Sequence, residues 1–197
     1  MENKNILDIN RNNYIEYNNG TSLDRMLNDY YQAINESNEL ITHSNIADMD
    51  QVVVSTSDKP IIGTQALDTC FGILLYDRKN KFGICGHADP HSIFGIVVEM
   101  LKQISSTTEG NIEYTIIPGY RAIEQQNFKC EEEIQDILRN YMSINPKIHF
   151  TSLKTPLNPS MPKGLLCYDF AFDTISGRDV TSIVFKDYAE EQRRHHI

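Results

Sequence analysis

The sequence lacks long hydrophobic runs, paired cysteines and an excess of basic residues. No stretch of its 197 residues approaches the length of a membrane span, and residues 1–5 contain no apolar core of a secretory signal. We therefore expect a soluble, cytoplasmic protein that neither crosses nor binds a membrane.

The cysteines and the charge balance exclude further classes of protein. The four cysteines are scattered without a C-x-x-C pair, which is typical of reduced thiols rather than of a disulfide framework. With 18 basic and 27 acidic residues the net charge is −9, which argues against a general binder of nucleic acid or anionic membranes. We expect no cofactor.

The length suits a single domain over residues 1–197, with a core over 51–192 and an N-terminal extension over 1–50. The extension opens with a polar, asparagine-rich stretch, which apolar residues at helical spacing then follow. This stripe predicts one amphipathic helix packed on the core, and the alternative is a substrate lid or a partner-binding segment. Its members are Leu23, Met26, Leu27, Tyr30, Tyr31 and Ile34.

The hydrophobic pattern of the core predicts a mixed sheet or sandwich covered by helices. Apolar runs over 71–76 and 82–85 flank a charged turn, which indicates a strand hairpin. Asp89 and Pro90 are typical of a helix start, with Pro90 at the first helical position. The other expected elements are a helix over 93–104, a strand over 111–117, a helix over 130–143, a strand over 147–153, and a hairpin of strands 165–172 and 180–185. This order favours an α/β or α+β fold.

One segment places a threonine, a cysteine and a histidine at a spacing suited to covalent catalysis. Cys70 lies six residues after Thr64, and His87 lies seventeen residues after Cys70. In the predicted hairpin, Cys70 opens one strand and His87 closes the other, so both lie at the same end of the sheet. A thiol beside an imidazole is the arrangement of an activated nucleophile.

This Thr-x5-Cys-x16-His spacing resembles two amidohydrolase families. One is the chemoreceptor glutamine deamidase family of bacteria, which has an α/β fold and a Gly-Ser where this chain has Asp68-Thr69. The other is the protein N-terminal asparagine amidohydrolase family, whose likeness spans roughly residues 52 to 192. The segments that carry this second resemblance are Gly63-Thr64, Thr69-Cys70, His87-x-Asp89, Pro118-Gly119-Tyr120, Phe172-Asp173-Thr174, Phe185-Lys186-Asp187 and Glu190-Glu191-Gln192.

The expected chemistry is hydrolysis of a primary amide by a cysteine. Cys70 attacks the carbonyl carbon, while His87 shifts the pair toward thiolate and imidazolium and then protonates the departing ammonia. Thr64 orients the imidazole through a hydrogen bond. The backbone N–H of Cys70 is the expected oxyanion donor, with Thr69 as the second.

The closer resemblance implies a protein or peptide substrate whose N-terminal asparagine becomes aspartate. An enzyme that selects a chain terminus binds an ammonium group, and Asp68 or Asp89 is expected to supply the countercharge. One alternative is deamidation of an internal glutamine in a partner protein, by a regulator or by an effector delivered into a host cell. The other is an inactive binding module on the same fold.

Each of these residues also has a purely structural interpretation. Cys70 could be a small buried hydrophobe, and Thr64 a β-branched strand residue. Asp68 could be a turn residue and Asp89 a helix N-cap.

The run Cys85, His87, Asp89 and His91 raises the question of a metal site. Alternate residues of a strand point the same way, so three of these side chains could converge on an ion. We expect no metal, because Pro90 turns His91 away from the strand.

Overall fold

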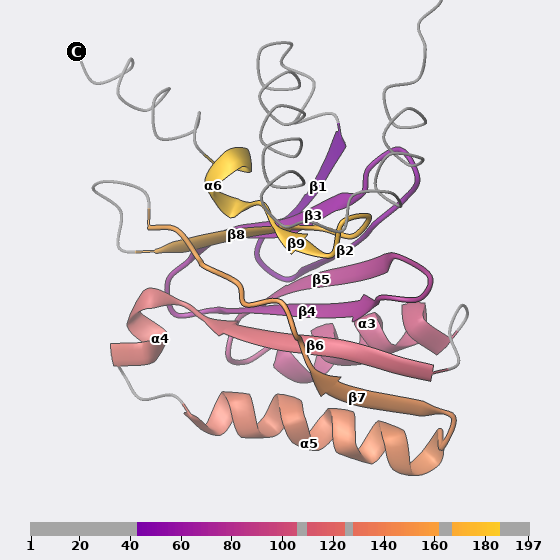
Figure 1. Cartoon of the computed structure of the whole chain (residues 1–197). Coiled ribbons are helices and arrows are strands. Elements are labelled where there is room, and N and C mark those ends of the chain that lie inside the picture. Colours follow the sequence, from indigo (N-terminus) through magenta and orange to yellow (C-terminus); the bar gives the residue numbers. More distant parts are fainter. Residues whose placement is uncertain (1–42, 106–109, 125–127, 162–166, 186–197) are drawn as a thin grey trace, which may run out of the picture. The chain divides into compact units, whose positions relative to one another are not determined.

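The computed structural model describes residues 43–105, 110–124, 128–161 and 167–185 (Figure 1). All of them belong to a compact unit that begins at His43. The helix expected within residues 23–34 and the Glu190-Glu191 segment lie outside these ranges. Within the described residues, no helix combines the length and apolar character that crossing a membrane requires.

Two β-sheets form the framework of this unit. Sheet A has the strand order β1-β3-β8-β9, with β1 parallel to β3 and the other neighbours antiparallel. Its strands are β1 (Ser44–Ala47), β3 (Ile61–Leu67), β8 (Tyr168–Asp173) and β9 (Arg178–Asp179). Sheet B has the order β2-β5-β4-β6-β7, with only β6 and β7 parallel. Its strands are β2 (Gln51–Val54), β4 (Phe71–Asp77), β5 (Phe82–Ala88), β6 (Gly110–Pro118) and β7 (Ile148–Ser152).

Two amphipathic helices cover one face of sheet B. Helix α3 (Ile93–Ser105) has buried apolar residues three or four positions apart, and α5 (Phe128–Ile144) buries every fourth residue from Cys130 to Leu138. Helix α3 approaches β5 closely at Gly86, where a Cβ atom would lie 2.7 Å from the sulfur of Met100. Two short helices, α4 (Tyr120–Glu124) and α6 (Thr181–Val184), follow β6 and β9.

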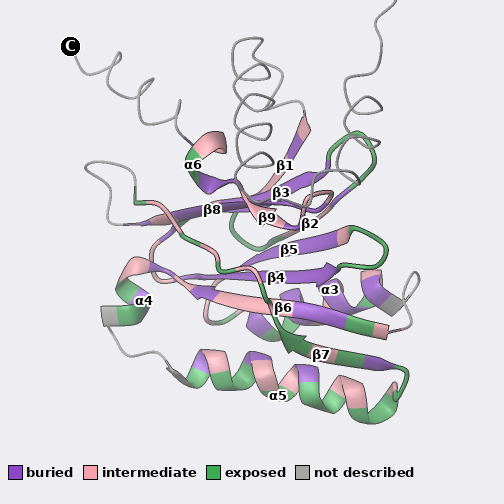
Figure 2. Ribbon diagram, viewed as in Figure 1, coloured by how far each residue is buried: buried purple, intermediate pink, exposed green. Residues whose placement is uncertain are grey.

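The other face of sheet B packs on sheet A. All seven residues of β4 are buried, because its two faces serve two different cores. Phe71, Ile73 and Leu75 join the cluster under the helices, whereas Leu74 joins a second cluster between the sheets. In Figure 2, β4 and β8 are largely buried, while α5 and β7 carry exposed residues. The order of layers is therefore helices, sheet B and sheet A, a mixed α/β class compatible with the α+β prediction.

Most predicted elements are confirmed, including the hairpin of β4 and β5 and both long helices. The strand predicted over 180–185 is wrong, because this segment contains α6. Asp179 accepts the N–H of Thr181 at 2.8 Å, and the Thr181 hydroxyl accepts the N–H of Ala171 at 2.9 Å. These two bonds anchor a helical turn against β8. Strands β1, β2 and β3 were not predicted, and β1 lies within the range assigned to the extension.

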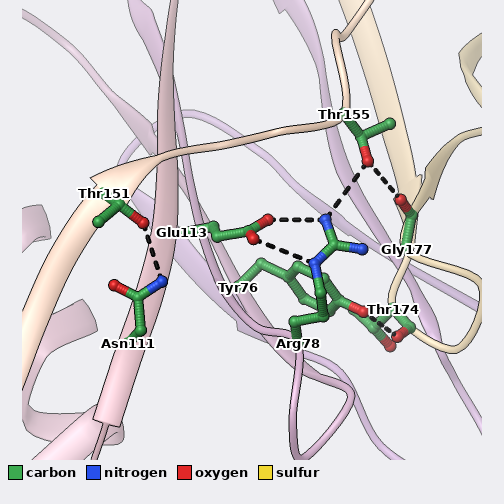
Figure 3. A network of polar contacts seen from close by, with 8 residues as sticks. All are labelled: Tyr76, Arg78, Asn111, Glu113, Thr151, Thr155, Thr174 and Gly177. Carbon is green, nitrogen blue, oxygen red and sulfur yellow. Dashed lines mark hydrogen bonds and ion pairs between the residues drawn. The ribbon is translucent and has the colours of Figure 1, made fainter.

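An ion pair between the partly exposed Arg78 and the buried Glu113 holds the end of β4 that lies farthest from Cys70. Arg78 donates to both carboxylate oxygens of Glu113, at 3.0 and 2.7 Å, and Glu113 is buried (Figure 3). Arg78 also reaches the hydroxyl of Thr155, which in turn donates to the carbonyl of Gly177 at 2.8 Å. The network ties the β8–β9 turn to sheet B.

Candidate active site

Cys70 and His87 lie on the same face of sheet B. The register of β4 and β5 pairs Gly72 with His87, and Cys70 precedes Gly72 by two residues. Cys70 immediately precedes β4 and packs in the cluster that Leu74 of β4 also joins, which places it on the face of His87. Cys70 belongs to the apolar cluster between the sheets, and His87 contacts Thr64 of sheet A. The structure thus brings Thr64, Cys70 and His87 into the space between the sheets.

A glycine opposite His87 makes room for this arrangement. A Cβ atom at Gly72 would lie 3.2 Å from Cγ2 of Thr64 and 2.6 Å from the ring of Phe170. A larger residue would push β3 and β8 away from the histidine. The close approach of the two sheets at this point therefore depends on Gly72.

The hydroxyl of Thr64 determines the tautomer of His87. Thr64 Oγ1 lies 2.8 Å from the carbonyl oxygen of Ala47 and 2.8 Å from His87 Nδ1. A carbonyl can only accept, so the single hydroxyl proton goes to Ala47, and Nδ1–H of His87 donates to Thr64. In the neutral ring Nε2 then carries the lone pair. Nε2 is buried and has no hydrogen-bond partner, Cys70 included, in the described chain.

Burial favours the uncharged forms of the Cys70 thiol and the His87 imidazole. It raises the pKa of the Cys70 thiol, and the charges of Asp89 and Asp50 raise it further, against a hydrogen bond from Thr69 that lowers it. Burial also lowers the pKa of His87, while the Ala47 carbonyl and nearby carboxylates act in the opposite direction. Both shifts favour a neutral thiol and a neutral imidazole over the thiolate and imidazolium expected from the sequence.

The segment after β6 holds the loop that carries Cys70. Gly119 donates its N–H to the carbonyl of Cys70 at 2.9 Å, and Ala122 donates to the carbonyl of Asp68 at 3.1 Å. A side chain at residue 119 is excluded, because its Cβ would lie 2.3 Å from the carbonyl oxygen of Asp68. The Pro118-Gly119-Tyr120 segment therefore supports the backbone around Cys70.

Asp68 is paired within the protein. Nε of Arg121 donates to Oδ1 of Asp68 at 2.6 Å, and a second guanidinium nitrogen contacts Oδ2. This bonding lowers the pKa of Asp68. Sequence reasoning missed Arg121, which lies 53 residues from its partner and carries no local signal.

A further carboxylate that the sequence did not reveal lies beside Asp89. Asp50 occupies the turn between β1 and β2, and its N–H donates to the carbonyl of His87 at 2.9 Å. Its carboxylate accepts the hydroxyl of Ser92 and, at 3.4 Å, the N–H of Asp89. The charges of Asp50 and Asp89 act on both Cys70 and His87. These two carboxylates form an acidic edge beside Cys70 and His87, the candidate dyad.

Asp89 opens a turn that precedes the helix. Its Oδ1 accepts the N–H of His91, and its carbonyl accepts the N–H of Ser92, both at 2.9 Å. Helix α3 begins only at Ile93, so the helix start predicted at Asp89 and Pro90 is wrong. Asp89 therefore caps the separate turn over 90–92 and not the first turn of α3.

The four side chains of the Cys85-to-His91 run do not share one environment. Cys85 is buried in the inter-sheet cluster, Nδ1 of His87 is bonded to Thr64, and His91 is exposed. Among the residues that the structure describes, no group of three or more His, Cys, Asp and Glu side chains could hold a metal ion.

Comparison with known proteins points to one family. The family described as "Protein N-terminal asparagine amidohydrolase" matches residues 43–167, which include Thr64, Cys70 and His87. This match confirms the closer of the two resemblances. Among curated proteins, the chain is 25% identical over 162 residues to "Uncharacterized protein R721" of Acanthamoeba polyphaga mimivirus. The alignment covers 70% of this chain and 57% of that protein, so the chain spans little more than half of the relative's length.

Proposed function

Because the chain belongs to the protein N-terminal asparagine amidohydrolase family, we propose that it hydrolyses the side-chain amide of an N-terminal asparagine in a protein or peptide. The products are an N-terminal aspartate and ammonia. The observation that carries the proposal is the hydrogen bond from His87 to Thr64, which leaves Nε2 free on the face of sheet B that Cys70 shares.

The first half of the reaction forms a thioester. The sulfur of Cys70 attacks the amide carbon while Nε2 of His87 takes the thiol proton. The carbonyl oxygen becomes an oxyanion, for which the backbone N–H of Cys70 is the main donor and Thr69 the second. When the tetrahedral intermediate collapses, the C–N bond breaks and the leaving nitrogen takes the proton from Nε2 as ammonia departs.

The second half returns the enzyme to its resting state. Water attacks the thioester carbon and gives a proton to Nε2, the C–S bond breaks, and the thiolate recovers that proton. Through both halves Thr64 holds the ring, because its own hydroxyl proton is anchored on Ala47. Thr64 carries no charge, so the negative edge formed by Asp50 and Asp89 supplies the electrostatic stabilisation of the imidazolium.

The same acidic edge recognises the chain terminus. In asparagine only two carbon atoms separate the ammonium nitrogen from the amide carbon, so the countercharge has to lie close to the nucleophile. Asp89, Asp50 and Asp68 all act electrostatically on Cys70, but the charge of Asp68 is matched by Arg121. We assign the ammonium site to Asp89, with Asp50 as its support.

The test compares four peptides: one that begins with asparagine, one that begins with glutamine, an acetylated asparagine peptide, and one with an internal glutamine. Ammonia release and a mass gain of about 1 Da are measured. Acetylation removes the ammonium and leaves the carboxylates without a partner, so kcat/KM should fall about a hundredfold or more. Glutamine should react more slowly, because an extra methylene displaces the amide carbon from the sulfur.

Two variants locate the ammonium site. Asp89→Asn should lower kcat/KM for the free terminus, whereas Asp68→Asn should preserve the preference for it. Equal rates on free and acetylated asparagine would reject the proposal. Turnover of the internal glutamine would instead support a glutamine deamidase, and inactivity on all four peptides would favour a binding module or a folded protein substrate.

A further inference from the structure

Strand β3 contains a bulge immediately before the nucleophile loop. The register pairs Thr64 with Phe170 and Leu67 with Tyr168, so two residues of β3 oppose a single residue of β8. One of the two, Ala66, has a φ of 58°, in the left-handed region that L side chains rarely adopt.

The bulge decides which way the residues around it point. Thr64 and Leu67 are three positions apart, so an unbroken strand would direct them to opposite faces. In the structure Thr64 bonds to His87, and Leu67 joins the cluster between the sheets. Both therefore face sheet B, and the chain reaches Cys70 three residues later.

Asp169 is the single residue of β8 opposite this bulge. Its Oδ1 accepts the N–H of Ala66 at 2.7 Å. Its own N–H and carbonyl are bonded to Ser160, each at 2.9 Å, so its backbone is held as well. Asp169 is only 2% exposed, and its Oδ2 has no hydrogen-bond partner among the described residues. A buried carboxylate with a free oxygen destabilises a fold, so a role outside stability is indicated.

We propose that Asp169 is a positioning residue for the catalytic dyad. By accepting the Ala66 N–H, it holds the bulge that directs Thr64 toward His87 and sets the start of the Cys70 loop. It acts only through the backbone, because its neighbours Tyr168 and Phe170 pack between the sheets and alternation turns Asp169 to the outer face of sheet A.

The role requires a hydrogen-bond acceptor and no charge. Burial raises the pKa of Asp169, against the lowering by the Ala66 N–H. An asparagine has nearly the same shape and retains an acceptor oxygen. Asp169→Asn should therefore preserve the function, whereas Asp169→Ala should remove it.

The experiment measures two properties of each variant. One is the rate at which iodoacetamide alkylates Cys70, followed by mass spectrometry from pH 6 to pH 10. The other is kcat and KM on a peptide with N-terminal asparagine. The kinetic readout rests on the proposed function, but alkylation needs no substrate. A wild type without turnover would therefore count against the proposed function alone, and the alkylation profiles would still test the role of Asp169.

For Asp169→Ala we expect kcat to fall at least about tenfold with KM nearly unchanged, and the alkylation profile of Cys70 to shift. The double variant Ala66→Gly/Asp169→Ala should recover most of the loss, because glycine adopts the left-handed conformation unaided. A general loss of packing would not be rescued in this way.

Three results would overturn the proposal. The first is a folded Asp169→Ala protein with wild-type kcat and alkylation profile. The second is a folded Asp169→Asn protein that loses as much activity as Asp169→Ala. The third is a folded double variant whose kcat is at least about tenfold below that of the wild type. This third result would overturn the positioning role even if Asp169→Ala alone does not fold.

Discussion

Thr64 of β3 and His87 of β5 join the two sheets through a hydrogen bond of 2.8 Å. Both residues are buried, and the Thr64 hydroxyl has already given its only proton to Ala47. The bond therefore runs from the ring to the hydroxyl and leaves Nε2 without a partner among the described residues. The orientation of the His87 ring depends on a neutral side chain supplied by the opposite sheet.

Thr64→Val should lower kcat by about ten- to a hundredfold, because it removes the hydroxyl and preserves the shape of the side chain. It also leaves the Ala47 carbonyl and Nδ1 of His87 buried without partners, which should destabilise the fold by about 1–3 kcal/mol. Thr64→Ser is the matched control and should retain most of the activity. Peptide kinetics and urea unfolding measure the two effects, and a fully active Thr64→Val would contradict the orienting role.

Cys70→Ala should abolish ammonia release in a protein that still folds, because Cys70 lies on the face that carries His87, whereas Cys85, the other thiol of the inter-sheet cluster, is 0% exposed and out of reach of a substrate. Cys130 lies in the helix-side cluster on the other face of sheet B. Cys130→Ala should therefore keep kcat near the wild-type value. Ammonia assays on both purified variants distinguish them, and turnover by folded Cys70→Ala would end the cysteine mechanism.

The pH profile should reflect a neutral resting dyad. Because the pKa of His87 is lowered, the base is already unprotonated at neutral pH, and kcat/KM should fall only when acidification protonates it. Because the pKa of Cys70 is raised, its alkylation rate should keep increasing above the pH range in which a free thiol ionises. Asp89→Asn removes a negative charge and should shift that alkylation curve to lower pH. Alkylation that is already maximal at neutral pH would indicate a preformed ion pair instead.

Arg78→Met should reduce the free energy of unfolding by about 1–3 kcal/mol, because it leaves the buried Glu113 carboxylate without its partner. The double variant Arg78→Met/Glu113→Gln removes that charge and should be more stable than Arg78→Met. Neither change should alter kcat, since the pair lies at the end of β4 opposite Cys70. Denaturant unfolding checks the first expectation and peptide kinetics the second. An Arg78→Met variant as stable as the wild type would show that the ion pair contributes nothing to the free energy of unfolding.

Local patterns in the sequence were sufficient to predict much of the core and the face of the sheet that Cys70 and His87 share. Two apolar runs on either side of a charged turn predicted the hairpin. Within it, Cys70 precedes Gly72 by two residues and Gly72 lies opposite His87, which is consistent with Cys70 and His87 on one face. The helical spacing of buried residues predicted α3 and α5 in the same way. These features depend on backbone geometry over a few residues, which the sequence expresses directly.

Only the tertiary structure decided the surroundings of that dyad. The sequence offered Asp68 and Asp89 as equivalent candidates and did not reveal Asp50, yet folding pairs Asp68 with Arg121 and brings Asp50 beside Asp89. The raised pKa of Cys70 and the lowered pKa of His87 likewise depend on burial between two sheets whose strands are far apart in the chain. Contacts between distant segments arise from packing, and no local pattern encodes which of several equivalent side chains a distant partner will reach.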